Sequence, residues 1–115
     1  MITIFQINLS DEEIDAINAG EFSPRYEAVR DTMTGYKWLK EKGLLESVQQ
    51  FYRPAIVVDT DSLETAFHLT NMWNDEKRVD RIESCKSTSV GDIAVEDNGR
   101  VSICDIFGWK TLEAA

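Results

Sequence analysis

The sequence predicts a single α+β domain over residues 1–115, in which helices pack on one face of a small, mostly antiparallel sheet of three to four strands. Short apolar segments with the composition of strands alternate with helical patterns that begin at recognisable capping residues. The last third of the chain adds the alternating apolar residues and the Asn98-Gly99 pair that are typical of a β-hairpin. A chain of 115 residues can bury one modest core.

The first predicted strand covers residues 2–7, where isoleucine and phenylalanine predominate. Ser10 and Glu13 then have the spacing of a capping box, which predicts a helix to about residue 19. Ser23 followed by Pro24 marks a second helix start, because the first helical turn does not need the N–H that proline lacks. Glycines interrupt the pattern from there to residue 51, so we expect two or three short helices.

A second predicted strand, residues 55–58, is apolar throughout, which indicates a place inside the sheet. Asp61 and Glu64 repeat the capping-box spacing and predict a helix to residue 72 or 73. The polar segment 74–83 is either a solvated helix or a connecting loop. The hairpin around Asn98-Gly99 follows, with a two-residue loop, and Trp109 begins a possible final strand after a turn or bulge.

The composition excludes several classes of protein. Hydrophobic residues make up 43% of the chain and charged residues 29%, as in ordinary soluble domains, and no segment reaches the roughly 18 apolar residues of a membrane span. The first residues lack the basic flank of a signal peptide, so we expect a cytoplasmic protein that binds no membrane. The net charge of −9 repels phosphate backbones, which disfavours direct nucleic-acid binding and favours a basic or nucleic-acid-binding protein as the partner.

Few residues are suited to catalysis or metal binding. Cys85, Cys104 and His68 are too few for a disulfide framework or a usual zinc site, and two reduced thiols are the simpler interpretation of the cysteines. Asp59, with Asp61 and Glu64, could hold a hard cation, but helix capping explains the last two without a metal. We therefore predict no catalytic residue, no metal and no cofactor.

The sequence leaves three hypotheses about function. Residues 87–92 either set the entry into the hairpin or form a binding loop. An enzyme or ligand-binding module would have its site near this loop, Asp59, Asp61 and His68. A self-associating module would pair the hairpin edge beside Trp109 with a second copy, as a homodimer.

The third hypothesis is a protein-binding surface. Its candidate interaction residues are Asp11, Glu12, Glu13, Asp15, Ser87, Ser89, Asp92 and Trp109. A stricter version is nucleic-acid mimicry, which requires one shared acidic surface. That surface would combine Asp11, Glu12, Glu13, Asp15, Asp75, Glu76 and Asp80.

Two motifs near the C-terminal end suggest a family. The segment Ser87-Thr88-Ser89-Val90-Gly91-Asp92-Ile93, a short hairpin and then Cys104-Asp105-Ile106-Phe107-Gly108-Trp109 resemble the C-terminal signature of small accessory proteins of tailed bacteriophages and of YodL-like domains of mobile elements. Ile2-Thr3-Ile4-Phe5-Gln6-Ile7 and Phe67-His68-Leu69-Thr70-Asn71-Met72 are also similar to uncharacterised marine-phage proteins. The clear likeness covers about a quarter of the chain. It implies a phage protein of the host cytoplasm without assigned catalytic residues. Together with the net charge and the lack of a catalytic set, it leads to the hypothesis of a protein that binds a host or phage protein and inhibits it or mimics nucleic acid.

Overall fold

The computed structural model describes residues 1–72, 76–82 and 86–112, except for the side chains of Met72 and Glu76. In chain order the elements are β1 (Ile2–Gln6), α1 (Asp11–Asn18), α2 (Pro24–Thr32), α3 (Tyr36–Glu41), α4 (Leu44–Gln49), β2 (Arg53–Val58), α5 (Leu63–Met72), the 3-10 helix η1 (Glu76–Arg78), β3 (Val79–Arg81), β4 (Ile93–Glu96), β5 (Val101–Asp105) and β6 (Gly108–Thr111).

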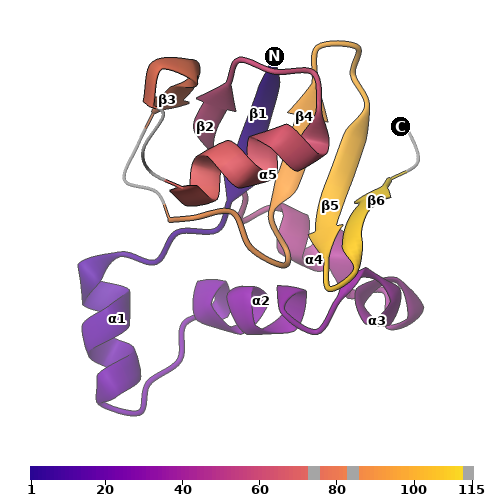
Figure 1. The fold of residues 1–115 in the computed structure, drawn as a ribbon. Helices are drawn as coiled ribbons and strands as arrows, with labels where there is room; N and C mark the ends of the chain where they lie inside the picture. Colours follow the sequence, from indigo (N-terminus) through magenta and orange to yellow (C-terminus); the bar gives the residue numbers. More distant parts are fainter. Residues whose placement is uncertain (73–75, 83–85, 113–115) are drawn as a thin grey trace.

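The strands form one antiparallel sheet in the order β3-β2-β1-β4-β5-β6 (Figure 1). The predicted α+β class and antiparallel sheet are confirmed, but the sheet has six strands rather than three to four. β3 was missed because only Val79 of its three residues is buried, and one apolar residue makes no alternating pattern. β1 lies between β2 and β4, so its main chain is paired on both edges.

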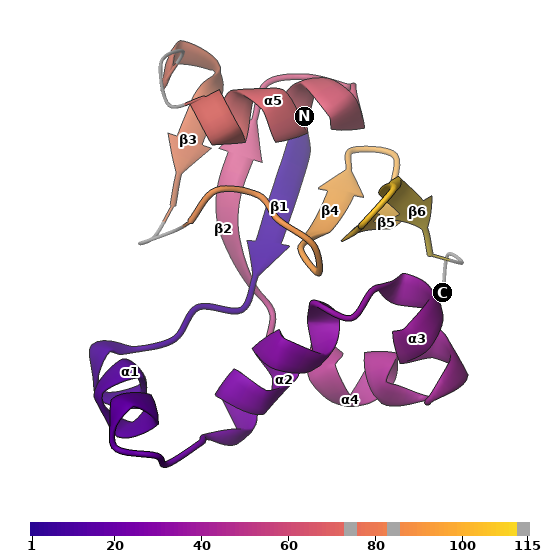
Figure 2. The same cartoon turned by 60° about the horizontal axis from the view of Figure 1, so that its bottom comes forward.

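Helices cover both faces of the sheet, which corrects the prediction of one covered face (Figure 2). Side chains of successive residues in a strand point to opposite faces, so Ile4 packs towards α5 while Phe5 packs towards α2–α4. The core on the α5 side comprises Ile2, Ile4, Ala55, Ile56, Val58, Ala66, Leu69, Val79 and Ala94. The core on the α2–α4 side comprises Ile7, Ala28, Leu39, Val48, Tyr52, Ile93, Ile103 and Leu112.

The two predicted starts of the first helices are confirmed. At α1 the Ser10 hydroxyl accepts the Glu13 N–H at 3.1 Å, and the Glu13 carboxylate accepts the Ser10 N–H at 3.1 Å. At α2 the Ser23 hydroxyl accepts the Tyr26 N–H at 3.1 Å. The segment 24–51 forms three short helices, within the predicted two or three.

The predicted cap of α5 is wrong by one residue. The Ser62 hydroxyl, rather than the Asp61 carboxylate, accepts an N–H of the first turn, from Thr65 at 3.3 Å. Asp61 instead lies 3.3 Å from the amino group of Met1. α5 has ten residues, and no helix in the part of the chain that the structure describes is long and apolar enough to cross a bilayer.

The predicted hairpin is confirmed as β4 and β5, but its two-residue loop is wrong. The connection contains residues 97–100, and Gly99 donates its N–H to the carbonyl of Glu96 at 2.9 Å. This bond centres the turn on Asp97 and Asn98. Gly99 follows the turn with φ +87°, a conformation that glycine adopts at little cost.

Gly91, just before β4, approaches α2 too closely for any other residue. Its φ is +97°, and a Cβ atom there would lie 2.5 Å from Oγ1 and 2.6 Å from Cβ of Thr32. Thr32 is buried, and its hydroxyl donates to the carbonyl of Val29 at 2.7 Å. The absence of a side chain at Gly91 therefore allows α2 to pack against the segment that enters the hairpin.

We predict that Gly91→Ala lowers the free energy of unfolding by about 3 kcal/mol. About 1 kcal/mol comes from the left-handed backbone and the rest from overpacking against Thr32. Gly20→Ala is the matched control, because Gly20 has φ +87° with no atom within 4 Å of the added Cβ, and should lose only about 1 kcal/mol. Urea denaturation followed by circular dichroism measures both losses. Equal losses in the two variants would show that Thr32 does not restrict this position.

Candidate functional site

The segment 86–92, here called the entry loop, runs between α5 and the layer formed by α2–α4 (Figure 2). The hydroxyls of Thr88 and Thr70 lie 2.5 Å apart, which joins the loop to α5. The Gly91 carbonyl accepts a hydrogen bond from the Tyr52 hydroxyl, just before β2, and the Gly91 N–H donates to Cys104 in β5 at 2.8 Å. The entry loop is thus held by α5, by Tyr52 just before β2 and by β5.

Asp92, at the end of the entry loop, is a buried carboxyl group. Its Oδ2 accepts the N–H of Ser89 at 3.0 Å and the side-chain amide of Gln6 at 3.0 Å. Burial raises the pKa of Asp92 to about 6, although the hydrogen bond from Ser89, the charge of Lys86 and the bond from Gln6 oppose the shift. The group therefore carries a negative charge at neutral pH that the fold must accommodate.

Gln6 connects this carboxyl group to the central strand. The Gln6 side chain is fully buried, and its amide also donates to the carbonyl of Lys86 at 2.9 Å. The Lys86 N–H donates back to Gln6 Oε1 at 3.2 Å. The Gln6 side chain thus extends the main-chain hydrogen bonding of β1 to the entry loop.

These contacts correct the prediction that Asp92 meets a partner. Only 3% of Asp92 is exposed, and its Oδ2 already accepts two internal hydrogen bonds. Ser87 and Ser89 are half-buried in the same loop, and Ser89 lines a groove on the α5 face. The bonds of Thr88, Gly91 and Asp92 support the interpretation that the entry loop sets the start of the hairpin.

Cys104 faces the same groove but is poorly suited to act as a nucleophile. Burial, with the nearby charges of Asp92 and Asp105, raises the pKa of its thiol to about 11. The thiolate, which is the reactive form, is therefore scarce at neutral pH. Cys85, the other cysteine, lies outside the described residues.

The groove lies between α5, the entry loop and the β5–β6 hairpin, and has a volume of about 500 Å³. Its lining is mainly apolar and includes Phe67, Val90, Ile106 and Trp109. Trp109, a predicted interaction residue, is half-buried there and packs against the core on the α5 side. Binding pockets are typically apolar with a few polar groups, and this groove has that character.

The turn beside the groove exposes two large apolar side chains. Ile106 and Phe107 connect β5 to β6, and they are 61% and 91% exposed. Phe67, on the other side of the groove, is 39% exposed. A cluster of exposed apolar residues beside a groove is characteristic of an interaction site. Ile106 and Phe107 are not among the predicted interaction residues, although they form an apolar pair at the turn before Gly108.

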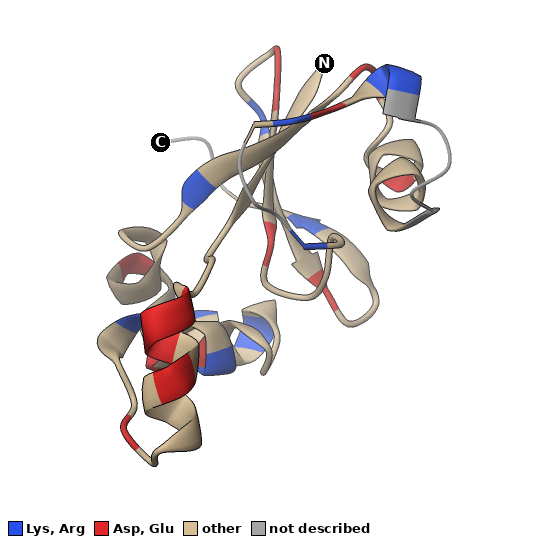
Figure 3. Ribbon diagram, turned by 90° about the vertical axis from the view of Figure 1, so that its left-hand side faces the viewer, with Lys and Arg blue, Asp and Glu red and all other residues tan. Residues whose placement is uncertain are grey.

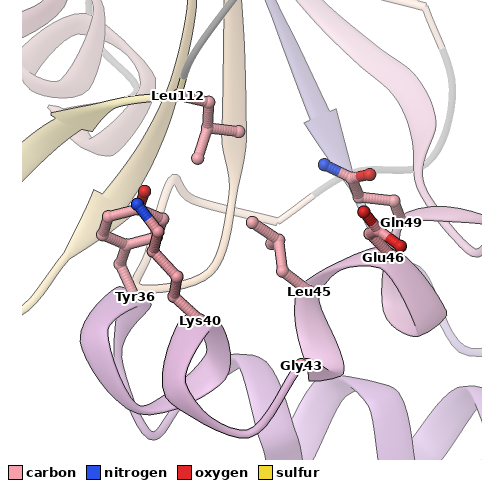
Figure 4. A pocket seen from close by; sticks show the side chains of 7 residues that line it. All are labelled: Tyr36, Lys40, Gly43, Leu45, Glu46, Gln49 and Leu112. Atoms are coloured by element: carbon pink, nitrogen blue, oxygen red, sulfur yellow. The ribbon is translucent and has the colours of Figure 1, made fainter. Parts of the chain in front are cut away.

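A second cavity, of about 520 Å³, lies on the opposite face of the sheet (Figure 4). Leu112, just after β6, lies across this cavity from Tyr36 and Lys40 of α3. The Lys40 ammonium group is 5.7 Å from the centre of the Tyr36 ring, a cation–π contact. The lining also includes Glu46, so this cavity does not favour one sign of charge.

The predicted acidic residues on α1 lie on a helix that projects from the body of the protein (Figures 1 and 3). No residue of α1 is buried, and Asp11, Glu12 and Asp15 are exposed. Glu13 is engaged internally, because it accepts the Ser23 hydroxyl at 2.7 Å. That bond, with contacts to the Ser10 N–H and the Arg25 guanidinium, lowers the pKa of Glu13.

Among the described residues, those predicted for nucleic-acid mimicry do not share one surface. Asp80 lies on β3, at the opposite end of the molecule from α1 (Figure 1). Asp75 lies outside the described residues, as does the side chain of Glu76. Of the predicted acidic residues, Asp11, Glu12 and Asp15 share the exposed surface of α1.

The structure does not bring together the residues of the alternative enzymatic site. Asp59 and Asp61 are exposed near the end of β2, and His68 is exposed on α5 without lining the groove. Asp92 is buried and bonded to Gln6. Among residues 1–72, 76–82 and 86–112, no three histidine, cysteine, aspartate or glutamate side chains are placed to hold a metal ion.

Comparison with protein-family models, curated proteins and solved structures finds no match to this chain.

We predict that Asp92 makes the protein less stable as the pH rises from 4 to about 7. Its folded-state pKa of about 6 exceeds the usual value of 3.8, so the folded state binds the proton more tightly than the unfolded state. The stabilisation is complete below about pH 4 and is lost as the pH rises through 6, which amounts to about 3 kcal/mol.

Asp92→Asn is the variant that isolates this effect, because an amide oxygen can still accept the bonds from Gln6 and Ser89. Urea denaturation from pH 3 to 7.5 should show that the wild-type protein loses about 3 kcal/mol more than the variant. Parallel pH profiles would mean that Asp92 ionises as easily in the folded chain as in the unfolded one.

Proposed function

We propose that this protein is a non-enzymatic phage accessory protein that binds a basic host or phage protein in the host cytoplasm. The observation that carries the proposal is the position of Phe107, 91% exposed at the rim of an apolar groove. Contact with a partner would remove about 150–250 Å² of aromatic surface from water. Aromatic side chains in such positions often contribute most of the binding energy of an interface.

The two segments that carry the resemblance to phage accessory proteins both contribute to the groove. That resemblance lies in the segments 87–93 and 104–109, which the β4–β5 hairpin joins. In the structure, Ser89 and Val90 from the first segment and Ile106 and Trp109 from the second line the same groove. A shared binding surface would be a physical reason for the two segments to occur together.

The charge of the protein supports a basic partner. The net charge is −9, and the exposed acids of α1 lie on a helix that no other element covers. Long-range attraction between such a surface and a basic protein accelerates association. The acids of α1 would steer the partner, and the groove would supply the short-range contacts that hold it.

The competing hypothesis of a small enzyme has less support. It required Asp59, Asp61 and His68 to converge with the entry loop, and these residues lie apart in the structure. The thiol in the groove has a raised pKa, which disfavours the nucleophilic form.

We predict that Phe107→Ser lowers the capture of the partner at least tenfold, because truncation of a central aromatic residue typically costs about 2 kcal/mol or more. To measure capture, tagged protein is immobilised and incubated with a bacterial lysate at low and at moderate salt. The retained proteins are then quantified by mass spectrometry. The free energy of unfolding should change by less than about 0.5 kcal/mol, because the side chain is exposed.

Met33→Ser is the matched control, because Met33 is also apolar and 59% exposed but lies at the end of α2, away from the groove. Proteins that are retained by the wild type and by this control but lost by Phe107→Ser would support the proposal. Identical capture by all three proteins, or no specific capture at either salt concentration, would contradict it.

A further inference from the structure

The outer edge of β6 presents main-chain groups that β5 does not use. Leu112 donates its N–H to the carbonyl of Val101 at 2.8 Å, which identifies a hydrogen-bonded pair. Such pairs alternate in an antiparallel ladder, so Lys110 and Gly108 also bond to β5, while Trp109 and Thr111 do not. The N–H and C=O groups of Trp109 and Thr111 therefore point away from the sheet.

The hydrogen bonds between β5 and the segment that leads into β4 support the same assignment of outward-pointing groups. Cys104 donates its N–H to Asp92 at 2.8 Å and accepts the N–H of Gly91 at 2.8 Å. Its main-chain groups therefore point away from Trp109, its partner in β6. Among the described residues, no hydrogen bond to the outward groups of Trp109 or Thr111 is found.

This edge adjoins the groove. Gly108 and Trp109, the first two residues of β6, belong to the lining, and the exposed turn of Ile106 and Phe107 precedes them. A strand placed beside β6 would direct every second side chain to the α5 face, next to Trp109. The edge would bind the main chain of such a strand, and the groove would receive its side chains.

We propose that an extended segment of the partner protein binds by adding a strand to β6, with alternate apolar side chains in the groove and a net positive charge. This inference rests on the proposed function, because it describes how the partner occupies that groove. Strand addition satisfies the outward groups of Trp109 and Thr111, which a helix laid in the groove would leave unbonded.

The charges around the groove indicate that the bound segment carries a positive charge. The carboxyl groups of its lining are Glu64 and Asp105, and the lining contains no lysine or arginine. Asp105 is engaged, because its Oδ1 accepts the Tyr36 N–H at the start of α3, at 3.1 Å. Glu64 is exposed and free to face a lysine or arginine of the segment.

A second copy of this chain is a less suitable occupant. Pairing two β6 strands about a two-fold axis at Lys110 would place two lysines opposite each other, which is destabilising. Two chains of net charge −9 also repel each other at long range.

The experiment uses a displayed library of random twelve-residue peptides, selected on the full wild-type chain. The proposal predicts enriched peptides in which apolar residues alternate and at least one lysine or arginine occurs. The selected peptide is then synthesised in two forms, with main-chain N-methyl groups on its odd or on its even residues. One form should bind at least tenfold more weakly and the other within about twofold, because only alternate residues face β6.

Thr111→Pro tests the same edge from the protein side. Proline removes an N–H that points away from β5, so the sheet keeps its own hydrogen bonds. The matched control is Thr111→Ala, which loses the same hydroxyl contact with Arg100 but keeps the N–H. The peptide should bind Thr111→Ala within twofold of wild type and Thr111→Pro at least tenfold more weakly. If Thr111→Pro does not fold, the binding of the two methylated peptides to the wild-type protein tests the proposal instead.

Four results would overturn strand addition: enriched peptides with apolar residues three and four apart, no enrichment, equal binding of both methylated forms, or equal binding of both folded Thr111 variants.

A dimer in light scattering that Thr111→Pro dissociates would assign the edge to a second copy instead. Loss of lysate capture in Phe107→Ser but not in Thr111→Pro would remove strand addition and leave the proposed function intact. Unchanged capture in both variants would remove both.

Discussion

The buried hydrogen bond between Gln6 and Asp92, 3.0 Å long, connects the central strand to the entry loop, and the rest of the structure depends on this connection. Gln6 occupies a position of β1 that would ordinarily be apolar, and Asp92 is a carboxyl group removed from water. Each polar group is acceptable in the interior because the other satisfies it. Without the pair, the loop would have fewer bonds to hold it between α5 and the helices of the opposite face.

The position of the loop explains why a groove exists on the α5 face. Thr88 bonds to α5 and Gly91 fits against Thr32 of α2, so the intervening residues cannot move far. Ser89 and Val90 are thereby held as one wall, opposite Ile106 and Trp109. A rigid polar network thus supports a mainly apolar surface, and a preorganised surface loses little conformational entropy when a partner binds.

The parts of the fold that sequence reasoning predicted correctly are those with local physical causes. A serine three residues before a glutamate caps its own helix, and an alternating segment around Asn98 and Gly99 forms its own hairpin. The pairing of β3 with β2 depends on residues more than twenty positions away, and its own sequence is polar, so no local pattern indicated it. The same holds for the groove, whose walls come from three separate segments, and for the burial of Asp92, which depends on Gln6.

The strand order has a consequence for how the chain folds. β1 precedes both of its neighbours in the chain: Ile4 pairs with Ile56 on one side and with Ala94 on the other, about 50 and about 90 residues later. The strands β4, β5 and β6 need only short loops to associate, whereas β1 must wait for contacts that close large loops. The central strand therefore gains its second neighbour only after β4 has followed it in the chain, and the last third of these residues completes the sheet around it.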